Sequence, residues 1–133
     1  MARVTLLGLP DDLGNQLTRV LLEESYQVSR KLYLSDLRRG PSFCAVFISG
    51  DSPEYQATLS LLREEYAGLP VIVVTRQPDA KHWLDVLESG ATDYCGAPFE
   101  RVQLRWILNS ALSQEARKKA ARPVLPAVAE AIH

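Results

Sequence analysis

Small hydroxyl and acidic residues follow the apolar runs that could form strands in this chain. Thr75 directly follows four consecutive β-branched aliphatic residues, and Ser49 follows six consecutive apolar residues. Asp51 lies two positions after Ser49, and Asp11 and Asp12 lie shortly after the first apolar run. Open α/β sheets place their chemistry at the carboxyl ends of their strands. These side chains are therefore the candidates for binding or reaction.

Five strand-like runs alternate with helix-like segments along the chain. The strands are predicted at 4–7, 26–34, 43–48, 71–74 and 93–96. The helices are predicted at 13–24, 35–37, 51–68, 78–89 and 99–121. The third and fourth runs lack polar alternation, which is typical of central strands buried on both faces. The alternation predicts an α/β fold, a three-layer doubly wound (βα)5 parallel sheet with right-handed crossovers.

The second half of the chain carries a motif that can be compared with a known family. A strand ends at Thr75, a Gly-Ala-x-x-Tyr turn ends at Tyr94, and Ala97-Pro98-Phe99 follows. This layout resembles the receiver domain of response regulators, which has Lys-Pro-Phe at the last position. The resemblance covers residues 3–112 and implies the flavodoxin-like strand order 2-1-3-4-5. We therefore expect a receiver-like domain at 1–116 and a helix end with a flexible tail at 117–133.

The resemblance implies a phosphorylation site, and most of its positions are altered here. A receiver has an acidic pair for magnesium, an acceptor aspartate, a Thr or Ser, and a lysine. Gly8 and Leu9 stand at the acidic pair, Ser49 at the acceptor and Ala97 at the lysine, so that Thr75 alone matches. Phosphoryl transfer needs metal and cationic partners. We therefore expect no conventional phosphorylation, no bound magnesium or other cofactor, and no enzymatic activity.

Two alternatives remain at the sequence level. Asp51 could accept a phosphoryl group with Asp11 or Asp12 binding magnesium, as a rearranged acidic site. Against this, Asp11 or Asp12 could cap the first helix, and Asp51 or Ser52 the third. A small doubly wound enzyme or nucleotide-binding protein is the other alternative. No Gly-x-Gly-x-x-Gly or Gly-x-x-x-x-Gly-Lys-Ser/Thr loop follows a strand, which disfavours it.

The resemblance also implies a surface for partners. Thr75 and Tyr94 match the two positions that change together when receivers switch. Val102, Arg105 and Trp106 follow on the last helix, and Trp and Arg are frequent anchors of interfaces. We predict that this face binds a protein partner, such as a kinase or an output protein, or forms a two-fold homodimer.

Composition restricts the other classes of function. The 133 residues include 15 basic and 16 acidic side chains, and the net charge of −1 argues against nucleic-acid binding. No apolar run approaches the ~18 residues of a membrane span. Cys44 and Cys95 are not in Cys-x-x-Cys spacing, which predicts buried free thiols, and His82 is expected at the surface. We expect a cytoplasmic module of bacterial two-component signalling.

Overall fold

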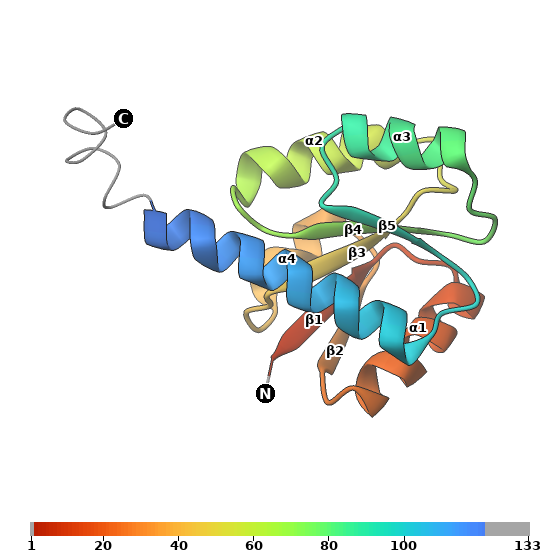
Figure 1. Ribbon diagram of the computed structural model, residues 1–133, viewed down its shortest axis with the longest axis horizontal. Coiled ribbons are helices and arrows are strands. Elements are labelled where there is room, and N and C mark those ends of the chain that lie inside the picture. The colour runs from red at the N-terminus through yellow and green to blue at the C-terminus, as the bar shows by residue number, and fades with distance from the viewer. Residues whose placement is uncertain (1, 122–133) are drawn as a thin grey trace.

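The computed structural model describes residues 2–121, which form one parallel sheet between two layers of helices (Figure 1). The sheet has five strands in the order β2-β1-β3-β4-β5, which confirms the predicted order. The strands are β1 (Arg3–Leu7), β2 (Gln27–Lys31), β3 (Ala45–Ser49), β4 (Val71–Thr75) and β5 (Asp93–Gly96). The strand order therefore reverses between the paired strands β1 and β3, which is the topological switch point of the sheet.

Helices cover both faces of this sheet. They are α1 (Asp11–Glu23), α2 (Tyr55–Glu65), α3 (Ala80–Glu88) and α4 (Arg101–Ala121), with a 3-10 helix, η1 (Leu34–Arg39), after β2. In Figure 1, α1 and α4 lie on one face, and α2 and α3 lie on the other. No helix within residues 2–121 has both the length and the apolar character that crossing a membrane requires.

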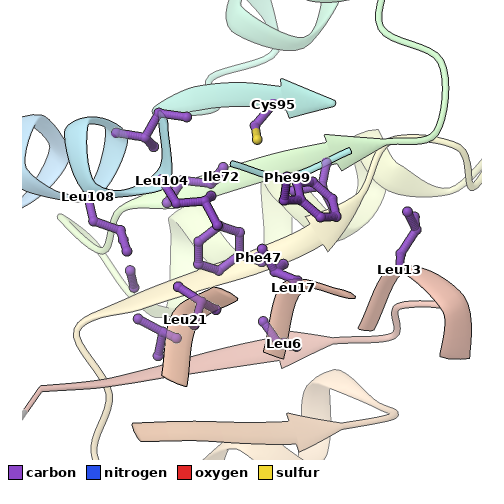
Figure 2. Packing of buried hydrophobic residues seen from close by; sticks show 14 residues of the cluster. Leu6, Leu13, Leu17, Leu21, Phe47, Ile72, Cys95, Phe99, Leu104 and Leu108 are labelled. Atoms are coloured by element: carbon purple, nitrogen blue, oxygen red, sulfur yellow. The ribbon is translucent and has the colours of Figure 1, made fainter. Parts of the chain in front are cut away.

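The two central strands are buried along their whole length because both of their faces carry apolar side chains. Phe47 and Ile72 point toward α1 and α4, where Figure 2 shows Phe47 among the leucines of these two helices. Val46 and Val73 point the other way, toward α2 and α3. The period of two along each strand thus supplies two separate cores from alternating residues of the same strands.

Several element boundaries differ from the prediction. α2 begins at Tyr55 instead of residue 51, and α4 begins at Arg101. The short helix after β2 is capped by Tyr33, whose backbone N–H donates to Asp36 Oδ2 at 3.2 Å, and not by Ser35. The α4 helix continues through Ala121, as predicted, and so includes the start of the segment 117–133 that was predicted as a helix end with a tail. The predicted tail beyond that helix, 122–133, lies outside the described residues.

Candidate functional site

The candidate residues meet at the carboxyl edge of the sheet, as the strand register requires. Leu7 of β1 is level with Ile48 of β3, and Thr75 of β4 is level with Gly96 of β5. One edge of the sheet therefore holds all the positions of the receiver site: the acidic pair, the acceptor, the hydroxyl and the lysine. Each of these residues is the last of its strand or follows shortly after it. What these residues contact decides the chemistry of the edge.

Gly8 and Leu9 offer no carboxylate at the edge, and the backbone explains why. Gly8 has φ +64°, a conformation that side chains with a Cβ rarely adopt, so an aspartate there would be strained. Leu9 is half-buried and packs against the core below α1 and α4, as does Ala97. The edge near β1 and β5 is therefore partly closed by apolar side chains.

Ser49 is buried, and its hydroxyl serves the backbone. Ser49 Oγ accepts a hydrogen bond from the backbone N–H of Asp51 at 3.2 Å, which tightens the turn after β3. No nucleophile-activating base contacts this hydroxyl among the described hydrogen bonds. The side chain is therefore a turn-forming group in this arrangement.

Asp51 does not cap α2, which corrects the expectation from the sequence. Its carboxylate turns toward β4, where Thr75 Oγ1 donates to Oδ1 and the backbone N–H of Arg76 donates to Oδ2 at 2.9 Å. The Arg76 guanidinium lies 4.0 Å from the same Oδ2. The carboxylate is therefore directed to the end of β4 and away from the amides of α2, which begins at Tyr55.

Asp12 binds the same guanidinium from the other side. Arg76 Nε donates to Asp12 Oδ2 at 2.9 Å, and Nη2 donates to Oδ1 at 2.6 Å, a bidentate pair. The hydrogen bond from Arg76 lowers the pKa of the Asp12 carboxyl below its ordinary value. Neither Asp11 nor Asp12 caps α1, because Pro10 holds the cap position, and Asp11 lies 3.8 Å from Arg30 instead.

Four side chains therefore gather at the carboxyl edge: Asp12 from α1, Asp51 from the segment after β3, Thr75 at the end of β4, and Arg76. We refer to these four residues as the Arg76 cluster. Sequence reasoning placed Asp12, Asp51 and Thr75 among the candidates and missed Arg76. The signal was present, because Arg76 directly follows the hydroxyl residue at the strand end.

The donor set does not fit the magnesium ion that the receiver resemblance implies. Magnesium prefers several oxygen ligands in octahedral arrangement. Gly8 and Leu9 provide none from their side chains, and both carboxylates of the Arg76 cluster already bind a guanidinium. Among residues 2–113, whose side chains are described, no group of three His, Cys, Asp or Glu residues could hold a metal ion.

Tyr94 is buried and is bound by a residue that the sequence placed at the surface. Its hydroxyl lies 2.9 Å from Nδ1 of His82, and the two rings meet edge to face with centroids 5.1 Å apart. His82 also meets Tyr55 edge to face and is half-buried, so the expectation of a solvent-exposed histidine was wrong. Burial raises the pKa of the Tyr94 phenol. The aromatic residue of β5 is thus tied to α3.

The predicted partner face is smaller than expected. Thr75 and Tyr94 are 1% and 9% exposed, so they contribute almost no surface. Arg105 is bound to Glu24 at the end of α1, with Nε 2.6 Å from Oε1. Val102 and Trp106 remain, 69% and 70% exposed on the outer side of α4. Only these two residues of the predicted face present free apolar surface.

A depression of about 310 Å³ lies beside Ser49, at the switch point between β1 and β3. Its lining residues include the apolar Leu7 and Ile48 and the hydroxyl residues Ser52 and Tyr55. Glu54 is the one charged residue among its lining residues. No nucleophile paired with a base lines this depression, and its chemistry does not indicate a reaction.

The cysteines take no part in the Arg76 cluster. Both are free, with Cys95 buried and Cys44 half-buried, so the prediction of buried thiols holds fully for Cys95 alone. Burial raises the pKa of the Cys95 thiol to about 12. A thiol with so high a pKa is unreactive at neutral pH.

Comparison with solved structures places the fold. A response regulator receiver domain protein from Clostridium thermocellum superposes with a TM-score of 0.74 at 15% identity, covering 87% of this chain and 98% of that one. A CheY-like receiver domain protein from Methanospirillum hungatei gives 0.72 at 16%, covering 89% and 98%. NtrX from Brucella abortus, solved with ADP, gives 0.80 at 18%, and the match covers 93% of this chain and 30% of that longer protein.

Sequence comparison gives no further relative. No protein-family model matches the chain, and no curated protein matches it significantly. At 15–18% identity, the likeness to these structures shows the fold alone. The chain has the flavodoxin-like fold of receiver domains, as the sequence predicted.

Proposed function

We propose that this chain is an atypical receiver-like module of bacterial two-component signalling, acting through protein contacts without conventional aspartate phosphorylation. The observation that carries the proposal is the occupation of the acidic site by Arg76. A guanidinium binds Asp12 and approaches Asp51, while a serine stands at the acceptor position and an alanine at the lysine position. The fold of a receiver is therefore kept while the groups that carry its chemistry are replaced.

The chemistry of phosphoryl transfer supports this proposal. Charge develops on the transferred group, and catalysis depends on a metal ion and cationic side chains positioned around it. In this chain the carboxylates of Asp12 and Asp51 are engaged by hydrogen bonds and a guanidinium, and Ser49 accepts a backbone hydrogen bond. An un-ionised serine hydroxyl without a base is a much weaker nucleophile than a carboxylate.

Incubation with a small phosphodonor and magnesium tests the proposal. We expect the intact mass of the full chain to show no gain of one phosphoryl group after treatment with acetyl phosphate and MgCl₂. The Clostridium thermocellum receiver domain protein, treated in parallel, serves as the comparison. A gain of one phosphoryl group that is abolished by Asp51→Asn would overturn the proposal.

A second function is favoured by one contact. Asp51 receives a hydroxyl hydrogen bond from Thr75 and lies beside a cation, and a hydroxyl and a cation are the groups that the resemblance places around the phosphoryl oxygens. With Asp12 nearby, this would be a phosphorylatable receiver with a rearranged acidic site. The same mass measurement separates the two functions, because only the second gives an adduct on Asp51.

The partners of the proposed module are proteins, such as a kinase or an output protein, in the cytoplasm. Val102 and Trp106 provide the apolar surface for such a contact. A homodimer through α3, β5 and α4 is the simplest form of it, since a two-fold contact closes without forming fibres. A solution structure of the activated NtrC4 receiver domain, similar in fold with a TM-score of 0.71 at 18% identity, is described as a dimer.

A further inference from the structure

We infer that Arg76 is the resident cation of this site: it takes the place of an exchangeable divalent ion and holds Thr75 in one orientation through Asp51. The inference rests on the proposed function and deepens it, because it names how the site is held without a phosphoryl group. Arg76 is a positioning residue in this role. Its side chain touches Asp12 and Asp51, and its effect on Thr75 passes through Asp51.

The geometry of the guanidinium supports the first part. Arginine presents five N–H donors in a rigid planar fork, which suits carboxylates on two of its sides. Here Nε and Nη2 bind both oxygens of Asp12, and Nη1 faces Asp51 Oδ2 at 4.0 Å. The backbone N–H of Arg76 adds a hydrogen bond to that Oδ2 at 2.9 Å. One residue therefore connects α1, the segment after β3 and the end of β4.

The charges of the cluster also support the role of Arg76 as its resident cation. Two carboxylates around one site repel each other unless a cation lies between them. A guanidinium stays protonated at all ordinary pH values, and it is attached to the chain. A metal ion would have to displace it and would lose the bidentate pair in exchange. The guanidinium therefore offsets one of the two negative charges whatever the concentration of magnesium.

The hydrogen bonds of Thr75 support the second part. The Thr75 hydroxyl donates its single hydrogen to Asp51 and accepts the backbone N–H of Gln77 at 3.2 Å. The side chain is 1% exposed, so water does not compete for these bonds. With Asp51 held by Arg76, the hydroxyl has one set of partners and one orientation.

A magnesium titration of the full chain tests the inference. We would compare the wild type with Arg76→Gln, Arg76→Lys and Arg19→Gln, with NaCl added to keep the ionic strength constant. Arg19 is an exposed arginine of α1 with no ion pair among the described contacts, so it controls for the lost charge. The readouts are the amide resonances of Asp12, Asp51 and Gln77 and the methyl resonance of Thr75.

We expect the wild type and Arg19→Gln to show no saturable shift up to 10 mM MgCl₂. Arg76→Gln should show a saturable shift of the Asp12 and Asp51 amides, and its Thr75 and Gln77 resonances should already differ from the wild type before magnesium is added. Arg76→Lys keeps the charge without the planar fork, so its response should be at least about threefold weaker than that of Arg76→Gln.

Two results would overturn the inference. One is a saturable magnesium response at Asp12 and Asp51 in the wild type, a measurement that does not depend on any variant folding. The other is a folded Arg76→Gln, or Arg76→Lys if the first does not fold, with wild-type resonances at Thr75 and no response to magnesium. The proposed function is tested separately by the phosphodonor experiment. A phosphoryl adduct on Asp51 would overturn the proposed function, whereas a saturable magnesium response of the wild type would overturn this inference.

Discussion

Gly50 follows β3 at a point where the backbone passes directly against two side chains. A Cβ at this position would lie 2.6 Å from Val73 Cγ1 and 3.1 Å from His82 Cε1. Val73 is fully buried, and His82 is held by Tyr94 and Tyr55, so neither can move freely. The glycine thus allows the histidine to lie between the two tyrosines.

We expect Gly50→Ala to lower the free energy of unfolding by about 1–3 kcal/mol, the usual cost of overpacking a core. Urea denaturation of wild type and variant measures this difference. Gly40→Ala is the matched control, because its Cβ would meet only the flexible end of Lys31, at 3.2 Å. Equal losses in the two variants would show that the packing around His82 is looser than described.

For single residues, the sequence predicted the place of a residue on its strand better than the side chains that it contacts. Ser49 and Thr75 were located correctly because the strand ends follow from unbroken apolar runs. The partner of Asp51 was not found, since Thr75 and Arg76 lie 24 and 25 residues away in sequence, and Asp12 meets Arg76 across 64 residues. Local rules favour a helix cap for an aspartate before a helix, and the tertiary contacts prevailed.

Among the elements, α4 is joined to the end of α1 by ion pairs, of which those of Glu24 are the shortest. Glu24, at the end of α1, receives Arg101 Nε at 2.9 Å and Arg105 Nε at 2.6 Å, and its side chain is 8% exposed. These hydrogen bonds, first from Arg105 and then from Arg101, lower the pKa of Glu24 to about 2. A negative charge at the C-terminal end of a helix is otherwise unfavourable, so the two arginines also offset the helix dipole.

The lowered pKa predicts how the stability depends on pH. The folded pKa lies below the ordinary value of 4.5, so Glu24 contributes stability above about pH 4.5 and loses it as the pH falls toward about 2. We expect the difference in unfolding free energy between wild type and Glu24→Gln to shrink between these values. Urea denaturation of both proteins at pH 7 and at pH 2.5 measures it. A difference that stays constant with pH would contradict the ion-pair explanation.

The elements themselves were predictable to different degrees. The β4 and β5 strands were found within one residue, because one is an unbroken β-branched run and the other lies between turn residues. The start of α2 was misplaced because Ser52 and Pro53 read as a local helix start. In the structure, Ser52 Oγ instead accepts the N–H of Glu54 at 3.2 Å, and the helix begins one residue later.

For the whole molecule, Val102 and Trp106 are the surface to test first. Trp106 is 70% exposed, so Trp106→Ala should change the unfolding free energy by less than about 0.5 kcal/mol. If the protein self-associates through this surface, the same change should weaken association by about 2 kcal/mol, as for an aromatic anchor. Analytical ultracentrifugation with circular dichroism measures both.

Leu22→Ala provides the control for that measurement, because Leu22 is 57% exposed on α1. It should leave both stability and association close to those of the wild type. If the wild type associates and Trp106→Ala associates equally well, the contact lies elsewhere. Unfolding of Trp106→Ala would show that the tryptophan supports the core.

The α4 helix also has a mechanical consequence. Its core contacts include Leu104, Leu108 and Ala111, its first turns are fixed by Glu24, and the helix then continues to Ala121, past the sheet in Figure 1. At 1.5 Å per residue, the ten residues after Ala111 form a stiff arm about 15 Å long. A tilt of about 10° at its base displaces the tip by roughly 2.5 Å over that length. A change in the angle between α1 and α4 would therefore be amplified along this arm, with its largest displacement at the Ala121 end.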